Sequence, residues 1–198
     1  METNEKTMSS QESIKIISDM IKKTKINVSH SAFYLIFWGW LVTILSLSEY
    51  FITIFTDFEN PWLVWLLSIV GVIVSMIYGF SKGSKQKVYT YAESIYMWVW
   101  MGFLTTATIL VIFIGFLNKM AVVGPFILLV AAMAIFISGI VMKFKPLIWG
   151  GVSIWVFSVI GFFAGPYIGP LAIPAAVITG YLIPGYMLKK ERPDNDTL

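Results

Sequence analysis

Residues 165–190, GPYIGPLAIPAAVITGYLIPGYMLKK, decide how this chain is organised. The segment is apolar enough to lie in a membrane, yet it contains four prolines, residues that normally interrupt helices. They are Pro166, Pro170, Pro174 and Pro184. The segment is therefore a loop, a spanning helix, or a broken helix of the kind found in transporters. The composition and charge of the remaining chain distinguish these three possibilities.

The composition is that of an integral membrane protein. Hydrophobic residues make up 58% of the 198 residues, charged residues only 13%, and the mean hydropathy is +0.80. Soluble domains carry about 25% charged residues. The apolar residues form six blocks of the length that an α-helix needs to cross roughly 30 Å of hydrocarbon. The blocks are residues 31–55, 62–80, 95–117, 121–142, 147–164 and 169–188.

The six blocks predict an all-α membrane protein, a bundle of six transmembrane helices. Strands of a β-barrel would alternate apolar and polar residues, whereas these blocks are continuously apolar. In a bilayer, helices then pair every backbone amide without water. Residues 1–30 are polar, so we expect no cleavable signal peptide and an uncleaved first span. The absence of cysteine excludes disulfides and thiolate metal sites.

Lysine and arginine fall almost entirely on one side of the predicted bundle. Of the 14, all but Lys119 lie in residues 1–30, in the loops after the second and fourth blocks, or in the tail, residues 189–198. Basic residues accumulate in cytoplasmic loops, so we expect both termini to be cytoplasmic, in a plasma (inner) membrane. The positive charge then fixes topology and contacts anionic lipid of the bilayer, and it implies no nucleic-acid partner.

Residues 9–30 are predicted to form an amphipathic cytoplasmic helix. Ser9 and Glu12 have the spacing of a capping box. An apolar stripe, here named the N-terminal stripe, recurs at helical spacing. It consists of Ile14, Ile17, Ile21 and Val28, with Met20 beside them. Such a helix lies on the inner leaflet or pairs with a partner helix, and its lysines favour the leaflet. For His30, at the junction with the first span, we expect a structural role.

The odd-numbered blocks share a glycine-containing start. The shared sequences are FWGWLVT at 37–43, WMGFLTT at 100–106 and IWGGVSI at 148–154. The even-numbered blocks begin with proline, so the pattern predicts three tandem hairpins in parallel orientation. Gly39, Gly102 and Gly150 align, and because glycine lets two helices approach closely, they are candidate helix-packing residues.

No pattern typical of catalysis is present. The chain has one histidine, and it contains no zinc-binding His-Glu-x-x-His, no Gly-x-Ser-x-Gly elbow and no glycine-rich phosphate loop. Its carboxylates fall mostly in the tails and loops. We therefore expect no enzyme activity, no cofactor and no bound metal.

Glu49, in LSLSEYF, is the one acid well inside an apolar block. Charged groups within spans are costly and often mark ion paths. Ser46 and Thr53 lie one turn on either side, and Thr43 extends that polar face inward. Glu49 therefore either reaches the outer interface as a structural hydrogen-bonding group, or it belongs to a polar or transport site that these hydroxyls line.

The predicted topology separates the four prolines of residues 165–190 into two turn residues and two candidate kinks. The chain must turn on the outer face at residues 165–169, so Pro166 and Pro170 are turn or first-turn residues, where proline causes no strain. Pro174 and Pro184 remain as candidate kinks. We expect a spanning helix kinked near Pro184 rather than a broken transporter helix.

Two functions fit these features. The first is a small multi-pass membrane protein that acts as an interaction or regulatory component, bound to another membrane protein or to a second copy of itself. The scarcity of charge inside the blocks and the lack of a soluble domain favour it. The second is a small transporter or channel subunit that uses Glu49 and the Ser and Thr residues within the blocks.

Overall fold

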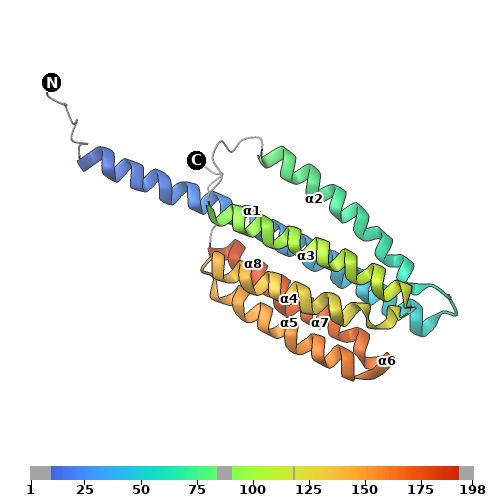
Figure 1. The fold of residues 1–198 in the computed structure, drawn as a ribbon. Helices are drawn as coiled ribbons and strands as arrows, with labels where there is room; N and C mark the ends of the chain where they lie inside the picture. Colours follow the sequence, from blue (N-terminus) through green and yellow to red (C-terminus); the bar gives the residue numbers. More distant parts are fainter. Residues whose placement is uncertain (1–9, 84–90, 118, 192–198) are drawn as a thin grey trace.

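The computed structural model describes residues 10–83, 91–117 and 119–191, with the backbone only at residues 10–31, 82–83, 91–93, 121, 166–167 and 191. The described residues form helices and no strand (Figure 1). Six of the helical segments are long and apolar enough to cross a membrane. The prediction of an all-α chain with six membrane-length helices is therefore confirmed.

The helices follow one another with few connecting residues. In chain order they are α1 (Ser10–Phe55), the 3₁₀ helix η1 (Pro61–Leu67), α2 (Ser68–Gly83), α3 (Tyr91–Phe116), the 3₁₀ helix η2 (Met120–Val122), α4 (Val123–Val141), α5 (Lys145–Phe163), α6 (Gly165–Ile168), the 3₁₀ helix η3 (Gly169–Leu171), α7 (Ala172–Val177), the π-helix η4 (Ile178–Leu182) and α8 (Ile183–Glu191). Continuous helix from η1 into α2 makes the second span, and η3, α7, η4 and α8 together make the last span.

The first helix is longer than the first apolar block. The block starts at residue 31, but α1 begins at Ser10 and continues without interruption to Phe55. No glycine or proline stands between Ser10 and Ala32 to end the helix. The segment that the sequence assigns to a cytoplasmic helix is therefore the first part of the helix that forms the first span. Its proposed capping residue, Ser9, lies outside the described residues.

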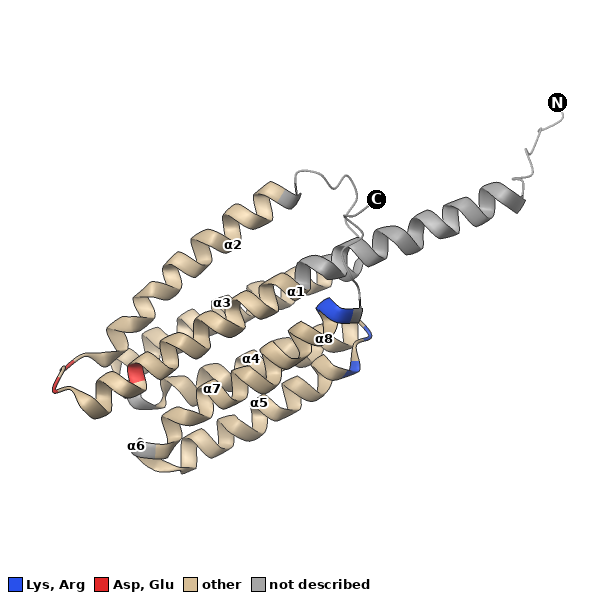
Figure 2. Ribbon diagram, turned by 180° about the vertical axis from the view of Figure 1, so that it is seen from behind, with Lys and Arg blue, Asp and Glu red and all other residues tan. Residues whose placement is uncertain are grey.

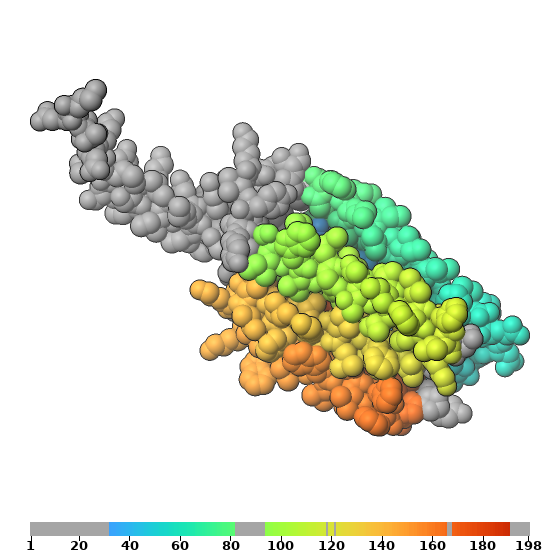
Figure 3. All heavy atoms as spheres, viewed as in Figure 1, coloured from blue at the N-terminus to red at the C-terminus, as the bar shows by residue number. Residues whose placement is uncertain are grey.

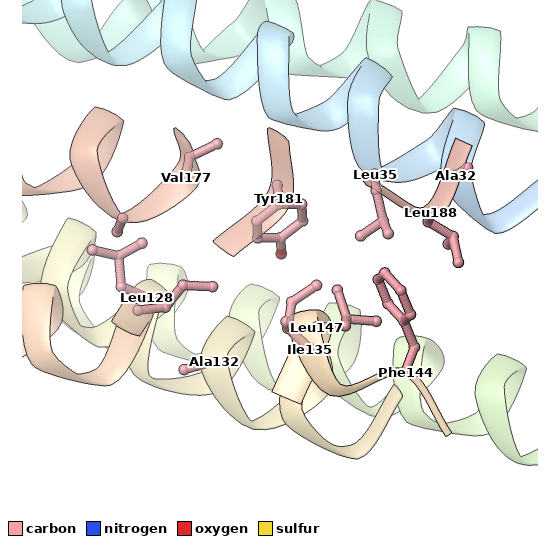
Figure 4. Packing of buried hydrophobic residues seen from close by; sticks show 12 residues of the cluster. Ala32, Leu35, Leu128, Ala132, Ile135, Phe144, Leu147, Val177, Tyr181 and Leu188 are labelled. Carbon is pink, nitrogen blue, oxygen red and sulfur yellow. The ribbon is translucent and has the colours of Figure 1, made fainter. Parts of the chain in front are cut away.

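The core is built by four of the six spans, α1, α4, α5 and the last span. Figure 4 shows side chains from all four meeting in one buried layer. The central residues of this layer are Leu35 of α1, Ile135 of α4, Leu147 of α5 and Tyr181 of the last span. Half of the last span's most apolar residues are buried, against 6% for the second and third spans. The last span is thus the enclosed element, and α2 and α3 are peripheral.

The second span stands away from the rest of the bundle (Figure 1) and reaches α1 through large side chains. The rings of Phe33 and Tyr78 stack with centroids 3.9 Å apart. The indole N–H of Trp38 donates to the hydroxyl of Ser75 over 3.0 Å. The third span lies over α4, and Figure 3 shows it from the exposed side. Aromatic residues thus make much of the contact between the first two spans, and Gly71 of α2 admits the side chain of Leu41.

Charge is distributed unevenly along the bundle. Among the described side chains, the lysines of the α4–α5 turn and of α8 lie at one end, and the acids near the C-terminal end of α1 and in the loop after it lie at the other (Figure 2). These acids are Glu49, Asp57 and Glu59. The separation follows the order of the spans, because each crossing takes the chain from one end to the other.

The turn between α4 and α5 carries Lys143 in a left-handed conformation, with φ of 53°. The N–H of Phe144 bonds to the carbonyl of Gly139 over 2.9 Å, and that of Lys143 bonds to the carbonyl of Ile140 over 3.0 Å. This is the Schellman arrangement that ends helices, and glycine usually occupies the left-handed position because it has no Cβ. Lys143 therefore holds a backbone conformation that disfavours its side chain.

We expect Lys143→Gly to increase the free energy of unfolding by about 1 kcal/mol, because glycine adopts this conformation without steric cost. Lys143→Ala is the matched control. It removes the same charge but keeps the Cβ, so it should give no gain. Thermal unfolding of the purified protein in detergent micelles measures both. Equal stabilisation by the two variants would assign the effect to charge instead of backbone conformation.

Candidate functional site

Glu49 lies near the C-terminal end of α1, partly buried against η1. Its Oε2 accepts a hydrogen bond from the indole N–H of Trp65 over 2.7 Å. Trp65 belongs to η1, whose start is set by Pro61 and by Asn60, which accepts from the indole of Trp62 over 3.1 Å. The one acid inside the first span is therefore tied to the beginning of the second span by a short hydrogen bond.

The hydroxyls predicted to line a polar face with Glu49 are satisfied within α1 itself. Thr43 donates to the carbonyl of Gly39 over 2.7 Å, and Ser46 donates to the carbonyl of Thr43 over 3.1 Å. Thr53 donates to the carbonyl of Glu49 over 2.8 Å. Thr43 and Ser46 are buried, whereas Thr53 is exposed. Bonds of this kind to the helix's own backbone are common for Ser and Thr in membrane helices.

Burial decreases along this face of α1 toward the end of the helix. Thr43 and Ser46 are buried, Glu49 is partly buried at the contact with η1, and Thr53 is exposed. The sequence placed Ser46 and Thr53 within one turn of Glu49, but it did not identify Trp65 as the partner. A shallow apolar hollow of about 290 Å³ lies elsewhere, between α1 and α2. It is lined by Phe33, Val74, Ile77, Tyr78 and Ser81.

The three aligned glycines occupy different environments. A Cβ added at Gly39 of α1 would lie 2.6 Å from Cδ2 of Leu182, and one at Gly150 of α5 would lie 3.0 Å from the carbonyl oxygen of Gly180. One at Gly102 of α3 would meet no atom within 4 Å. Gly39 and Gly150 thus lie against the π-helix η4, whereas Gly102 is exposed.

The irregular part of the last span lies between the two candidate kinks, Pro174 in α7 and Pro184 in α8. Residues Ile178–Leu182 form the π-helix η4. Pro184 has no N–H to offer the carbonyl of Gly180, and its ring would press on that carbonyl in a regular α-helix. The wider turn relieves this conflict one turn before the proline. Both prolines are buried, and the Gly180 carbonyl lies beside the bare Cα of Gly150.

Polar contacts between spans gather around α5, and the sequence did not single them out. Ser153 Oγ lies 3.1 Å from Thr179 Oγ1 of η4. Ser158 donates to the carbonyl of Pro125 over 2.7 Å, and the indole N–H of Trp155 donates to the carbonyl of Leu129 over 3.3 Å. The sequence does not show which carbonyl a hydroxyl within a span will bond to. These bonds join α5 to α4 and to the last span.

Trp100 of α3 is the residue that brings the third span to the π-helix. Its ring lies 6.4 Å from that of Tyr181 and 5.5 Å from that of Phe103. Its indole N–H is buried and has no hydrogen-bond partner within the described parts of the chain. A buried donor without a partner costs on the order of 1–3 kcal/mol, so this contact is held by ring packing.

Comparison of the chain with protein-family models, with curated proteins and with solved structures finds no match in any of the three. Within the described residues, no group of three or more His, Cys, Asp or Glu side chains is placed to hold a metal ion. The geometry around Glu49 is that of a carboxylate used to join two spans.

We expect Gly150→Ala to lower the free energy of unfolding by about 1–3 kcal/mol, because its Cβ would press on backbone atoms of Gly180 that cannot move aside. Gly102→Ala is the matched control, at the aligned position of α3. It should leave stability unchanged or raise it by up to about 1 kcal/mol, because alanine is the better helix former. Thermal unfolding in micelles measures both. Similar losses in the two variants would contradict a special role for Gly150.

We expect Glu49→Leu to lower the free energy of unfolding by about 1–3 kcal/mol, because the indole N–H of Trp65 would lose its acceptor. Glu49→Gln should cost much less, since its amide oxygen still accepts. Adding Trp65→Phe to Glu49→Leu should recover part of the loss, and a double-mutant cycle measures the coupling. Additive effects of the two substitutions would show that the hydrogen bond does not stabilise the fold.

Proposed function

We propose that this protein is a small multi-pass membrane protein that acts as an interaction or regulatory component rather than as a catalyst. The observation that carries the proposal is the continuity of α1. At 1.5 Å per residue its 46 residues extend about 69 Å, and those before Ala32 account for roughly 33 Å. One rigid element thus joins the amphipathic segment to the core of the bundle.

The polar groups of the first span support the same proposal. The hydroxyls of Thr43 and Ser46 bond to their own helix, and the carboxylate of Glu49 bonds to Trp65. An ion path would need polar groups aimed into a common space. The exposed apolar faces of α2 and α3 offer surface to lipid, to another membrane protein or to a second copy of the chain.

We further propose that both termini lie in the cytoplasm and that the protein resides in a plasma (inner) membrane. The described lysines of the α4–α5 turn and of α8 gather at one end of the bundle, in agreement with the bias of basic residues to cytoplasmic loops. The tail of residues 1–30, with its amphipathic helix, then lies on the cytoplasmic side. The α1–α2, α3–α4 and α5–last-span pairs are three hairpins that each enter from the cytoplasm.

A small transporter or channel subunit is the second candidate function, and the π-helix η4 favours it. Single π turns in membrane helices frequently occur at functional sites. Here the turn carries Tyr181, which lies in the core layer, and Thr179, which lies beside Ser153 of α5. In this alternative Glu49 and the intramembrane hydroxyls carry a proton or a small solute.

Flux measurements distinguish the two functions. We expect liposomes containing the wild-type protein to pass protons and small solutes no faster than protein-free liposomes, and Glu49→Gln to behave identically. Size-exclusion chromatography of the detergent extract before reconstitution controls for folding. Flux that is present in the wild type and lost in Glu49→Gln would overturn the interaction proposal and establish the transporter.

A further inference from the structure

An exposed hydrogen bond crosses the line along which α1 and α8 pack, here named the α1–α8 seam. The two helices meet closely there, and a Cβ added at Gly185 would lie 3.1 Å from the Cβ of Leu35. The indole N–H of Trp40 donates to the phenol oxygen of Tyr186 over 3.0 Å. Both side chains are 48% exposed, although each belongs to a segment apolar enough to cross a membrane. The seam therefore presents two polar groups to the lipid.

The hydroxyl of Tyr186 still has a hydrogen bond to give after this contact. A phenol can accept one hydrogen bond and donate another. Its oxygen accepts from Trp40, and within the described part of the chain no acceptor is placed for its own O–H. Tyrosine rings at the ends of spans lie at the level of the lipid headgroups. The phosphate and ester oxygens of a phospholipid are acceptors at that level.

Two lysines share this part of α8. Lys189 and Lys190 follow Tyr186 by three and four residues, the spacing at which side chains are neighbours on a helix. Both lysines are exposed, and the acids with described side chains lie at the other end of the bundle (Figure 2). The seam thus combines a hydroxyl donor with two positive charges. Charged donors of this kind bind phosphate oxygens with short, strong hydrogen bonds.

Apolar side chains continue the same surface away from the lysines. The first and last spans run in opposite directions, because an odd and an even crossing form the pair. Ile44 lies one turn beyond Trp40 on α1, and Ile183 lies one turn before Tyr186 on α8. Both isoleucines are therefore farther from the lysine end, and both are exposed. An acyl chain that extends from a headgroup at the lysines would lie over them.

We propose that the α1–α8 seam binds one phospholipid with an anionic headgroup. Lys189 and Lys190 bind its phosphate, the hydroxyl of Tyr186 donates to a headgroup or ester oxygen, and an acyl chain covers the exposed isoleucines. The lysine charges select an anionic headgroup over a zwitterionic one. Such a site differs from general attraction between basic residues and lipid, because it requires the tyrosine hydroxyl and retains its lipid in detergent. The proposed interaction function does not depend on it.

Native mass spectrometry of the full-length protein, released from detergent micelles, tests the proposal. Phosphatidylglycerol and phosphatidylcholine with identical acyl chains are added at equal concentration. We expect the wild type to retain one phosphatidylglycerol at least about tenfold more often than one phosphatidylcholine, because each lysine near an anionic group contributes about fivefold in affinity. Lys189→Gln combined with Lys190→Gln should abolish this preference.

Matched variants separate the seam from the basic end as a whole. Lys143→Gln combined with Lys145→Gln removes the same charge from the α4–α5 turn at the same end of the bundle, and it should keep the preference. Tyr186→Phe should lower retention about threefold to tenfold, because one hydrogen-bond donor is lost. Trp40→Phe keeps that donor and should cost less. Unchanged elution on size-exclusion chromatography verifies that each variant folds.

The opposite results would each overturn the proposal. Equal retention of the two lipids, or of neither, would exclude an anionic-lipid site in the wild type. Equal losses from the two lysine pairs, or undiminished retention by Tyr186→Phe, would replace the site at the seam with diffuse attraction to the basic end. Inorganic phosphate should not displace the retained lipid, since it has no acyl chain; displacement would make a free phosphate ion the ligand.

Discussion

The close approach of Gly150 and Gly180 is the constraint on which the bundle depends. Apolar surface gains little by moving from lipid to protein, so membrane helices associate through tight packing and interhelical hydrogen bonds. The two glycines let the backbones of α5 and the last span meet, because neither position carries a Cβ to separate them. Gly39 provides a similar approach from α1, where it meets Leu182. The last span is therefore held from both sides at its irregular turn. The bonds from Ser158 and Trp155 to α4 add directional contacts to the same interior.

The sequence predicts the number and length of the spans because both follow from the thickness of hydrocarbon, a constraint that acts on each segment alone. It does not predict which spans are enclosed, since the second span has nearly the same mean hydropathy as α4, 2.3 against 2.4, and yet is peripheral. Gly39, Gly102 and Gly150 share a local sequence pattern, but only Gly39 and Gly150 lie close to another helix. Whether a glycine makes such a contact depends on the helix that faces it, and the local pattern does not show which helix that is. The prolines locate the distortion of the last span to within a turn. Its form, a π turn ahead of Pro184, depends on the space that Gly150 leaves.

Glu49 illustrates a different limit of sequence reasoning. An acid within a span indicates either a functional site or a structural hydrogen bond, and the choice depends on a partner that sequence spacing does not reveal. Trp65 is 16 positions away, across the turn between the first two spans, and periodicity within a single helix cannot connect it to Glu49. Helical periodicity points instead to the hydroxyls of α1 that are spaced one or two turns from Glu49. Those hydroxyls donate hydrogen bonds to backbone carbonyls of α1 itself. Local spacing thus identified the polar residue but not its hydrogen-bond partner, Trp65.

The unbroken α1 links the two ends of this arrangement. Hydropathy divides the chain near residue 31, because the solvent around the helix changes there, but nothing in residues 10–55 ends the helix itself. The same helix therefore extends beyond the bundle and packs Gly39 against the π turn. Gly39 of this helix lies against Leu182 and Tyr181 of the last span. Tyr181 in turn contacts Trp100 of α3. The enclosed last span thus contacts both α1 and the peripheral α3 at its irregular turn.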